Sequence, residues 1–499
     1  MKKRALPGAP DLLCLARNLH ATFFKESRIR LNRITSAMGA RRVLALSPLF
    51  VFVLSALSAA AQTATINWAE AHQVIDGFGA SDASNTNTSM SSGNQNFFFG
   101  TGSGQLGLSI LRVELPNGDS TYGAPGDCSS VGTSCAGTYL SDMRAMIAAG
   151  GRIYSSSWTP PAAYKTNGYT TCSTGAGNGA LLTGDYGLYA TWLANFVLSL
   201  AAQSPAIPLY ALSFQNEPDS CPFYDGALWT AAQIDTFMVN NLGPTFAADS
   251  LSTLLFMPED GEYADITGAN GGGTCATDPF CTAYVSGYNF HDYDANLSGL
   301  DTVRADPYPS GWPAGKKYWE TEASCFTGGV YFCQSGFNTD ITDALDWAAV
   351  IDQRIVGDGL NAWLYWWLIC ENNTDDEGLM ARNGTIAQRA YMLGQYAKFV
   401  RPGYYRIGAT HVPQTGVTVS AYQQTSSNTL SIIATNYTDS PVTQTFNIIS
   451  APTFSTLTPT QTSATHSLSK LSNLSVAGNS FSYTLPAQSI TTFAGTGTP

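Results

Sequence analysis

The segment LYALSFQNEPD, residues 209–219, decides the fold of this chain. Its first half is an apolar, strand-like run, and it ends abruptly in Asn216-Glu217-Pro218. A carboxylate therefore stands where a buried strand gives way to a loop, which is where parallel barrels carry their functional side chains. A second segment, KYWETEAS at residues 317–324, repeats this design and places Glu322 at its carboxyl end.

Two carboxylates in such positions suggest a particular chemistry. Glycosidic bonds break through an oxocarbenium-like transition state, which needs one carboxyl to protonate the leaving oxygen and another to attack or to activate water. Glu217 and Glu322 suit that division, so the sequence predicts a glycosidase pair. Glu320 shares the strand face of Glu322 but lies about two residues deeper, which makes it the weaker candidate.

Apolar strand-like runs recur along the chain, with helical stretches between them. This alternation predicts an α/β fold, a (β/α)8 TIM barrel. The expected strands are 74–79, 108–114, 152–158, 209–217, 252–258, 285–291, 317–322 and 361–367, and the clearest helices are 140–149, 186–202, 231–242 and 339–356.

The composition changes after residue 401 to alternating Thr, Ser, Val and Asn with frequent turn residues. This pattern predicts antiparallel strands, so we expect residues 401–499 to form a β-sandwich side domain. The catalytic barrel is assigned to residues 72–400, and residues 62–71 are expected to add a strand to the side domain.

Residues 1–61 are expected to be removed as a signal peptide with a basic preamble. Arg41-Arg42 precedes an apolar run at 43–54, and Ala59-Ala60-Ala61 supplies an Ala-x-Ala cleavage site. A membrane anchor is the alternative, but the run is short for a bilayer and contains Pro48. We therefore expect a secreted, extracellular or periplasmic protein.

The composition limits the partners. The 499 residues include 24 Lys+Arg and 36 Asp+Glu, and the net charge of −12 repels nucleic acid and anionic membranes. We expect a monomer whose partner is a polysaccharide. The five histidines offer no clustered ligand set, so we expect no metal and no cofactor.

Nine cysteines remain after residue 61, and their spacing suggests disulfides in an oxidising compartment. Sequence alone does not fix the connectivity. The pairs considered are Cys128/Cys135, Cys275/Cys281, Cys325/Cys333 and Cys172/Cys221, with Cys370 left over.

Several short motifs in order make the chain resemble glycoside hydrolase family 30. They are GFGA at 77–80, ILRV at 110–113, SWTPP at 157–161, QNEP at 215–218, Thr321-Glu322, Trp366-Trp367, KFVRPGY at 398–404 and LPAQSITTF at 485–493. The resemblance covers essentially the whole chain after the signal segment.

The resemblance implies that Glu217 is the general acid/base and Glu322 the nucleophile of a retaining hydrolysis. A protonated Glu217 is needed until attack has occurred, so we predict that burial and the neighbouring charge raise its pKa. The resemblance implies Asn216 at the sugar 2-hydroxyl, Arg112 beside the nucleophile, and His291 and Tyr293 near it. Trp158 and Trp366 end expected strands, so we expect them to form aromatic walls for the sugar. Asp119 is a further sugar-binding candidate.

Within that family the chain most resembles bacterial endo-xylanases that cut glucuronoxylan, which read glucuronate with an arginine-bearing loop. Here the corresponding loop, LICENNTDDEG at 368–378, has no arginine and four acidic residues. We therefore expect a β-xylanase that does not need glucuronate. A β-1,6-galactanase or β-1,6-glucanase is the nearest alternative. Lys165 and the residues after it resemble the glucosylceramidase-like branch, and a non-catalytic carbohydrate-binding barrel is the non-enzyme alternative.

The signal-peptide assignment predicts the amino terminus of the secreted protein. Amino-terminal sequencing of secreted material should begin near Gln62. Secreted material that retains residues 1–61 would refute the assignment.

Overall fold

The computed structural model describes residues 63–83, 89–118, 125–175, 179–268, 271–295, 313–325 and 336–499. The expected signal segment lies outside the described residues, and so does Asp119, the weakest of the sugar-binding candidates. Both assignments stay predictions.

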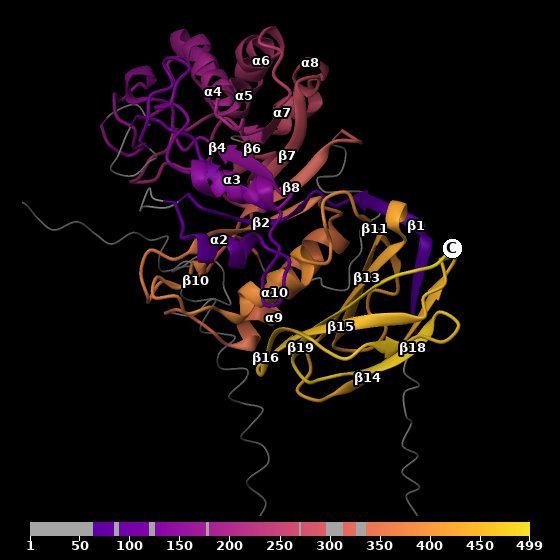
Figure 1. Cartoon of the computed structure of the whole chain (residues 1–499). Coiled ribbons are helices and arrows are strands. Elements are labelled where there is room, and N and C mark those ends of the chain that lie inside the picture. Colours follow the sequence, from indigo (N-terminus) through magenta and orange to yellow (C-terminus); the bar gives the residue numbers. More distant parts are fainter. Residues whose placement is uncertain are drawn as a thin grey trace, which may run out of the picture. The chain divides into compact units, whose positions relative to one another are not determined.

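Eight parallel strands form a closed barrel (Figure 1). Neighbours in the sheet follow chain order, and β9 closes the barrel by pairing with both β2 and β8. The strands are β2 (Gly77–Ser81), β3 (Ile110–Glu114), β4 (Arg152–Ser156), β5 (Leu209–Ser213), β6 (Leu254–Asp260), β7 (Val285–His291), β8 (Lys317–Glu322) and β9 (Ala362–Ile369). A short strand, β10 (Gly378–Met380), pairs with β9 beside the barrel. The predicted barrel is confirmed.

Each expected strand is present, but β5 ends earlier than the sequence predicted. The sequence pattern extended this strand to Glu217, whereas the ladder ends at Ser213. Asn216 N–H donates instead to the carbonyl of Ser157, at 2.7 Å, and Glu217 has a φ of 45°. A left-handed φ is incompatible with a strand, so Glu217 stands on a turn above the barrel rim.

Helices occupy the connections between the strands. They are α2 (Ser92–Phe99), α3 (Leu140–Ala148), α4 (Tyr186–Ala201), α5 (Ala231–Phe237), α6 (Gly243–Ala248), α7 (Gly273–Thr277), α8 (Pro279–Thr282), α9 (Ile341–Asp352) and α10 (Gln388–Ala397). The four helices predicted from the sequence are present. Two of them end in a π-helical turn, Met238–Leu242 after α5 and Gln353–Gly357 after α9.

The side domain is one curled sheet. Its strand order is β16-β15-β19-β13-β12-β11-β1-β14-β18, and β17 pairs with β15. The strands are β1 (Ala64–Val74), β11 (Tyr405–Ala409), β12 (Val417–Gln424), β13 (Thr429–Asn436), β14 (Val442–Ile449), β15 (Thr456–Ser463), β16 (His466–Lys470), β17 (Leu474–Ser475), β18 (Ser480–Leu485) and β19 (Ser489–Thr496). Figure 1 shows indigo β1 beside orange β11, so the start of the described chain joins strands from its end. The domain bounds themselves stay predictions.

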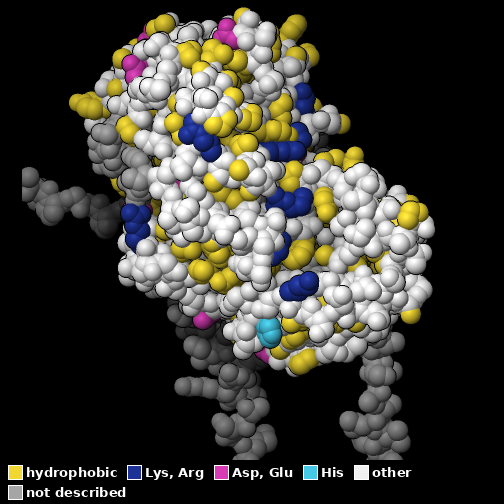
Figure 2. All heavy atoms as spheres, in the orientation of Figure 1, with side chains coloured by type: hydrophobic (Ala, Val, Ile, Leu, Met, Phe, Trp, Pro, Cys, Tyr) yellow, Lys and Arg dark blue, Asp and Glu magenta, His cyan; other side chains and the backbone are white. Residues whose placement is uncertain are grey.

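The side domain has its own apolar core, which includes Phe446, Phe481 and Phe493. It is hydrogen-bonded to the barrel: Ser431 Oγ donates to the carbonyl of Phe399 at 2.7 Å, and Thr492 Oγ1 to that of Gln395 at 3.1 Å. Charged side chains are sparse on the face that Figure 2 shows, as the composition predicts. Among the described residues, no helix is long and apolar enough to cross a membrane.

Three of the considered cysteine pairs are disulfides: Cys128–Cys135, Cys172–Cys221 and Cys275–Cys281. Cys370 is a free, buried thiol, as the spacing suggested. Cys333 lies outside the described residues, so its pairing with Cys325 stays a prediction.

The barrel interior is filled by aromatic side chains around Trp319. This ring lies 4.7 Å from the ring of Phe256 and 5.8 Å from that of Tyr154, and stacks on Tyr210 at 6.0 Å, between centroids. Its Nε1–H donates to Asp76 Oδ2 at 3.0 Å. Trp319 lies on β8, the strand that carries Glu322, and packs against side chains of β4, β5 and β6.

Replacing Trp319 should be costly. A Trp319→Ala substitution leaves a large cavity and removes one hydrogen bond to Asp76, so we expect the free energy of unfolding to fall by about 3–5 kcal/mol. Denaturant unfolding measures this, with Leu188→Ala, at a 52% exposed position on α4, as the control. Equal losses in both variants would contradict the packing role.

Candidate active site

Glu217 and Glu322 face each other at the carboxyl-terminal rim of the barrel. Glu217 follows β5, and Glu322 ends β8. One carboxylate oxygen of each lies within 4.8 Å of the other and of a nitrogen of His291. Glu322 is 5% exposed, and the Glu217 side chain is 12% exposed. The structure therefore brings together the two glutamates that the sequence singled out, in a largely dehydrated site.

Arg112, in the middle of β3, is the centre of this site. Its guanidinium is fully buried, and Nη1 donates to Glu322 Oε2. Nη2 donates to Asn216 Oδ1 at 2.6 Å and to Glu259 Oε1 at 3.1 Å, while Nε donates to Ser156 Oγ at 3.3 Å. One side chain thus fixes groups on four other segments of the barrel rim.

Glu259 is a third carboxylate of the site, and the sequence analysis missed it. It is 0% exposed and ends β6 with a φ of 70°. Ser156 Oγ donates to its two oxygens at 2.6 and 2.8 Å, and Arg112 donates to Oε1. Burial alone would raise the pKa of Glu259. The charge of Arg112 and the hydrogen bonds to this carboxylate have the larger effect together, and they lower the pKa to about 2. An acidic residue after an apolar strand-like run was the available signal, but the expected strand stopped at Pro258.

His291 lies among the three carboxylates. Its Nδ1 is 3.0 Å from Glu217 Oε1, and its Nε2 is 3.6 Å from Glu259 Oε1 and 3.7 Å from Glu322 Oε2. Burial acts to lower the pKa of this imidazole, but the surrounding negative charge and hydrogen bonds raise it to about 10. His291 is therefore an imidazolium at neutral pH, and its Nδ1–H donates to Glu217.

The predicted rise in the pKa of Glu217 is wrong for this state of the site. Burial acts to raise that pKa, but the hydrogen bond and charge of His291, with the hydrogen bond from Tyr224, lower it overall. The predicted rise assumed the negative charge of the neighbouring carboxylate, whereas the positive charge of His291 acts in the opposite direction. The proton expected on Glu217 resides instead on His291 Nδ1, 3.0 Å away.

Two tyrosines complete the carboxylate contacts. Tyr293 Oη donates to Glu322 Oε1 at 2.7 Å, and Tyr224 Oη donates to Glu217 Oε2 at 3.3 Å. Tyr293 was among the sequence candidates, whereas Tyr224 was not. No pattern in its loop marked Tyr224, because the contact depends on the path of that loop.

The rings of Trp158 and Trp366 lie beside each other and both pack against Arg112. Their ring centroids are 5.8 Å apart, and the guanidinium carbon lies 4.5 Å from the Trp158 centroid and 5.4 Å from that of Trp366. Trp158 follows β4, and Trp366 lies within β9, which continues to Ile369. Trp158 is 8% exposed and Trp366 is half-buried, so Trp366 offers the more accessible ring.

Glu320 does not reach this cluster of contacts. It is 0% exposed, and its Oε2 accepts the N–H of Leu364 at 2.9 Å. Burial raises its pKa well above the ordinary value. Glu320 is thus a buried carboxyl that is hydrogen-bonded to the barrel backbone. This agrees with its position, deeper along the strand than Glu322, as the weaker of the two candidates.

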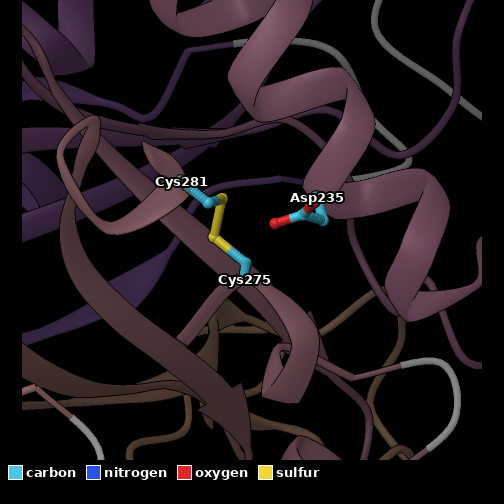
Figure 3. A group of neighbouring side chains, drawn as sticks. All are labelled: Asp235, Cys275 and Cys281. Atoms are coloured by element: carbon cyan, nitrogen blue, oxygen red, sulfur yellow. A yellow bond between two sulfur atoms is a disulfide. The ribbon is translucent and has the colours of Figure 1, made fainter. Parts of the chain in front are cut away.

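Three groups of potential metal donors among the described residues bear on the expectation of a metal-free protein. Glu217, His291 and Glu322 form one, but Arg112 and the His291 imidazolium already provide the positive charge there. Asp235, Cys275 and Cys281 form the second, and Figure 3 shows that its two sulfurs are joined in a disulfide, which removes the thiolates that a metal requires. Cys325, Asp343 and Asp376 form the third, and Arg389 pairs with both of its carboxylates.

Lys165, which resembled the glucosylceramidase-like branch, is turned into the protein. It is 3% exposed, and its Nζ donates to Thr159 Oγ1 at 2.8 Å and to the carbonyls of Thr170 at 2.5 Å and Gly226 at 2.7 Å. Burial lowers its pKa to about 7. This lysine connects loops around the site and does not face a substrate.

Known proteins share this architecture. No protein-family model matches the chain. The chain is 30% identical over 442 residues to the glucuronoxylanase XynC of Bacillus subtilis strain 168, which covers 87% of this chain and 92% of that protein. A glycoside hydrolase family 30 subfamily 8 xylanase of Clostridium acetobutylicum is similar with 32% identity and a TM-score of 0.69, over 87% of this chain and 99% of that one. A GH30 endoxylanase of Clostridium papyrosolvens gives 30% identity and a TM-score of 0.69, over 87% and 100%.

The relatives, together with facing carboxylates after β5 and at the end of β8, place the chain among barrel enzymes that hydrolyse O-glycosides. Identity at this level over most of its length fixes the family. The chain belongs to glycoside hydrolase family 30.

The charge network predicts how His291 responds to a change at Glu259. A Glu259→Gln substitution removes a negative charge 3.6 Å from Nε2, so the imidazolium loses stabilisation and its pKa should fall by about one unit or more. Nitrogen NMR of the imidazoles measures this, with His291→Gln for assignment. Asp249→Asn, at an exposed position after α6, is the control. An unchanged His291 pKa in Glu259→Gln would contradict the network.

Proposed function

We propose that this chain is a secreted, retaining endo-β-xylanase that does not need glucuronate side chains. The observation that carries the retaining mechanism is the separation of the two carboxylates. Oxygens of Glu217 and Glu322 lie within 4.8 Å, and retaining glycosidases hold their carboxyl groups about 5 Å apart, whereas inverting enzymes leave about 6.5–9.5 Å for a water molecule.

The first half of the reaction uses Glu322 as nucleophile. One of its oxygens attacks the anomeric carbon, a C–O bond to the enzyme forms, and the bond to the leaving sugar breaks. Arg112 Nη1 and Tyr293 Oη each donate to one Glu322 oxygen, which holds the carboxylate in place. The leaving oxygen takes its proton from Glu217.

His291 supplies the proton that Glu217 needs. The imidazolium donates to Glu217 Oε1 in the free site. As the leaving oxygen becomes basic, a proton can pass from Nδ1 to Glu217 and on to the leaving sugar. In the second half, water forms the new C–O bond at the anomeric carbon as the bond to Glu322 breaks, and Glu217 takes the proton of that water and returns it to His291 Nδ1.

The sugar at the reaction centre is held by groups whose orientation the protein fixes. Asn216 Oδ1 accepts from Arg112 Nη2, so its Nδ2 is left to donate to the sugar 2-hydroxyl. Trp366 and Trp158 supply aromatic faces beside the sugar. Arg112 is fully buried, so we assign it to positioning rather than to direct substrate contact.

The loop after β9 supports independence from glucuronate. Of its four acidic residues, Asp376 is paired with Arg389, at 2.5 Å, which leaves Glu371, Asp375 and Glu377. Burial, and then the negative charges of Asp375, Glu322 and Glu371, raise the pKa of Glu377 to about 8. Glu377 is therefore mostly protonated near neutral pH, and a negatively charged uronate would meet the charges of Glu371 and Asp375 in a loop without arginine.

The substrate and location rest on relatives and on cysteine chemistry. The similar proteins are a glucuronoxylanase and family 30 xylanases. Disulfides form in oxidising compartments, and three are present among the described residues. A glucosylceramidase-like glycosidase stays a further alternative, and "Putative glucosylceramidase 4" of Caenorhabditis elegans is 25% identical over 53% of this chain. A 1,6-linked glycan remains the alternative substrate.

Product analysis tests the substrate. Mass spectrometry after incubation with glucuronoxylan, arabinoxylan, β-1,6-galactan and β-1,6-glucan should show xylo-oligosaccharides from both xylans. The matched Glu322→Gln variant should release none. Products from glucuronoxylan alone would contradict independence from glucuronate, and products only from a 1,6-linked glycan would overturn the xylanase assignment.

A further inference from the structure

Phe223 is unusually exposed for a phenylalanine. Its side chain is 74% exposed, and only Phe280, at 72%, is comparable among the phenylalanines that the structure describes. Phe223 lies in the connection between β5 and α5, six residues after Glu217. Connections that follow barrel strands surround the catalytic face, so this ring is presented to solvent at the rim of the active site.

The loop that carries Phe223 is firmly held. Cys221 is bonded to Cys172, and Ser173 N–H donates to the carbonyl of Pro222 at 3.2 Å. Asn117 Nδ2 donates to Asp225 Oδ2 at 2.7 Å. The buried Lys165 donates to the carbonyl of Gly226. The backbone on both sides of Phe223 is therefore held in place. An aromatic side chain on such a rigid loop binds a partner with little loss of conformational entropy.

The same loop contacts the acid/base glutamate. The ring of Tyr224 meets the ring of Phe223 edge to face, with centroids 5.4 Å apart. Tyr224 Oη donates to Glu217 Oε2 at 3.3 Å. In the proposed reaction Glu217 protonates the oxygen of the leaving sugar, so the neighbouring loop borders the leaving-group side of the cleft.

We propose that Phe223 forms a leaving-group subsite, on which a sugar ring of the departing part of the β-glycan stacks. Sugar rings have an apolar face of C–H groups that suits an aromatic surface. The subsite rests on the proposed roles of Glu217 and Glu322. It predicts that the enzyme gains efficiency from sugars beyond the cleavage point, as expected for internal cleavage of a chain.

Kinetics with two substrates tests the subsite. For Phe223→Ala we expect kcat/KM on xylohexaose to fall about 5- to 10-fold, the effect of losing one aromatic contact. On an aryl β-xylobioside, whose small phenol leaves no sugar on that side, the change should stay within about 2-fold. Phe223→Trp should retain the wild-type preference for xylohexaose.

Phe280→Ala is the matched control, because Phe280 is equally exposed but lies on α8, just before β7 at the opposite end of the barrel. Phe280→Ala should leave kcat/KM unchanged on both substrates. If Phe223→Ala lowered kcat/KM equally on both substrates, the loop would act by positioning Glu217. If kcat/KM on xylohexaose did not change, Phe223 would form no subsite. Either result overturns the proposal.

Affinity electrophoresis separates this proposal from the substrate assignment. Glu322→Gln protein, with and without Phe223→Ala, is run in gels containing arabinoxylan, β-1,6-galactan or β-1,6-glucan. Weaker retardation of the double variant in the arabinoxylan gel supports the subsite as stated. The same effect only in a 1,6-linked glycan supports a Phe223 subsite while the xylanase assignment fails, and no effect in any gel overturns the subsite.

Discussion

The buried guanidinium of Arg112 is the interaction on which the rest of the site depends. It donates to Glu322, Asn216, Glu259 and Ser156, and the adjacent rings of Trp158 and Trp366 pack against it. A buried charge is tolerated only when its hydrogen bonds and charge partners are in place. The barrel closure that aligns β3, β4, β6 and β8 therefore also assembles the carboxylates of the proposed active site.

Charge balance is the second constraint on the site. Glu217, Glu259 and Glu322 carry up to three negative charges, and Arg112 and His291 carry two positive ones. Three such carboxylates in a dehydrated site would repel one another without these cations. The balance also explains why the mobile proton is on His291 in the free site, hydrogen-bonded to the residue that must deliver it.

The sequence predicted the barrel, its eight strands and the two glutamates, because strand periodicity and strand-end carboxylates are local patterns. Glu259 escaped because its role exists only through contacts with Arg112 and Ser156, which are more than a hundred residues away in sequence. The direction of the Glu217 pKa was wrong for the same reason: it depends on His291, whose position relative to Glu217 is set by the fold. Tyr224 and the fixed loop of Phe223 also depend on tertiary contacts.

In the proposed mechanism, Glu322 attacks the sugar while Glu217 protonates the leaving group. The most direct measurement is mass spectrometry of the protein after reaction with a 2-deoxy-2-fluoro-β-xylobioside that carries a good leaving group. This mechanism predicts one glycosyl adduct, mapped by peptide digestion to Glu322. An adduct on another residue, such as Glu217 or Glu259, or complete turnover with inversion at the anomeric carbon, would contradict it.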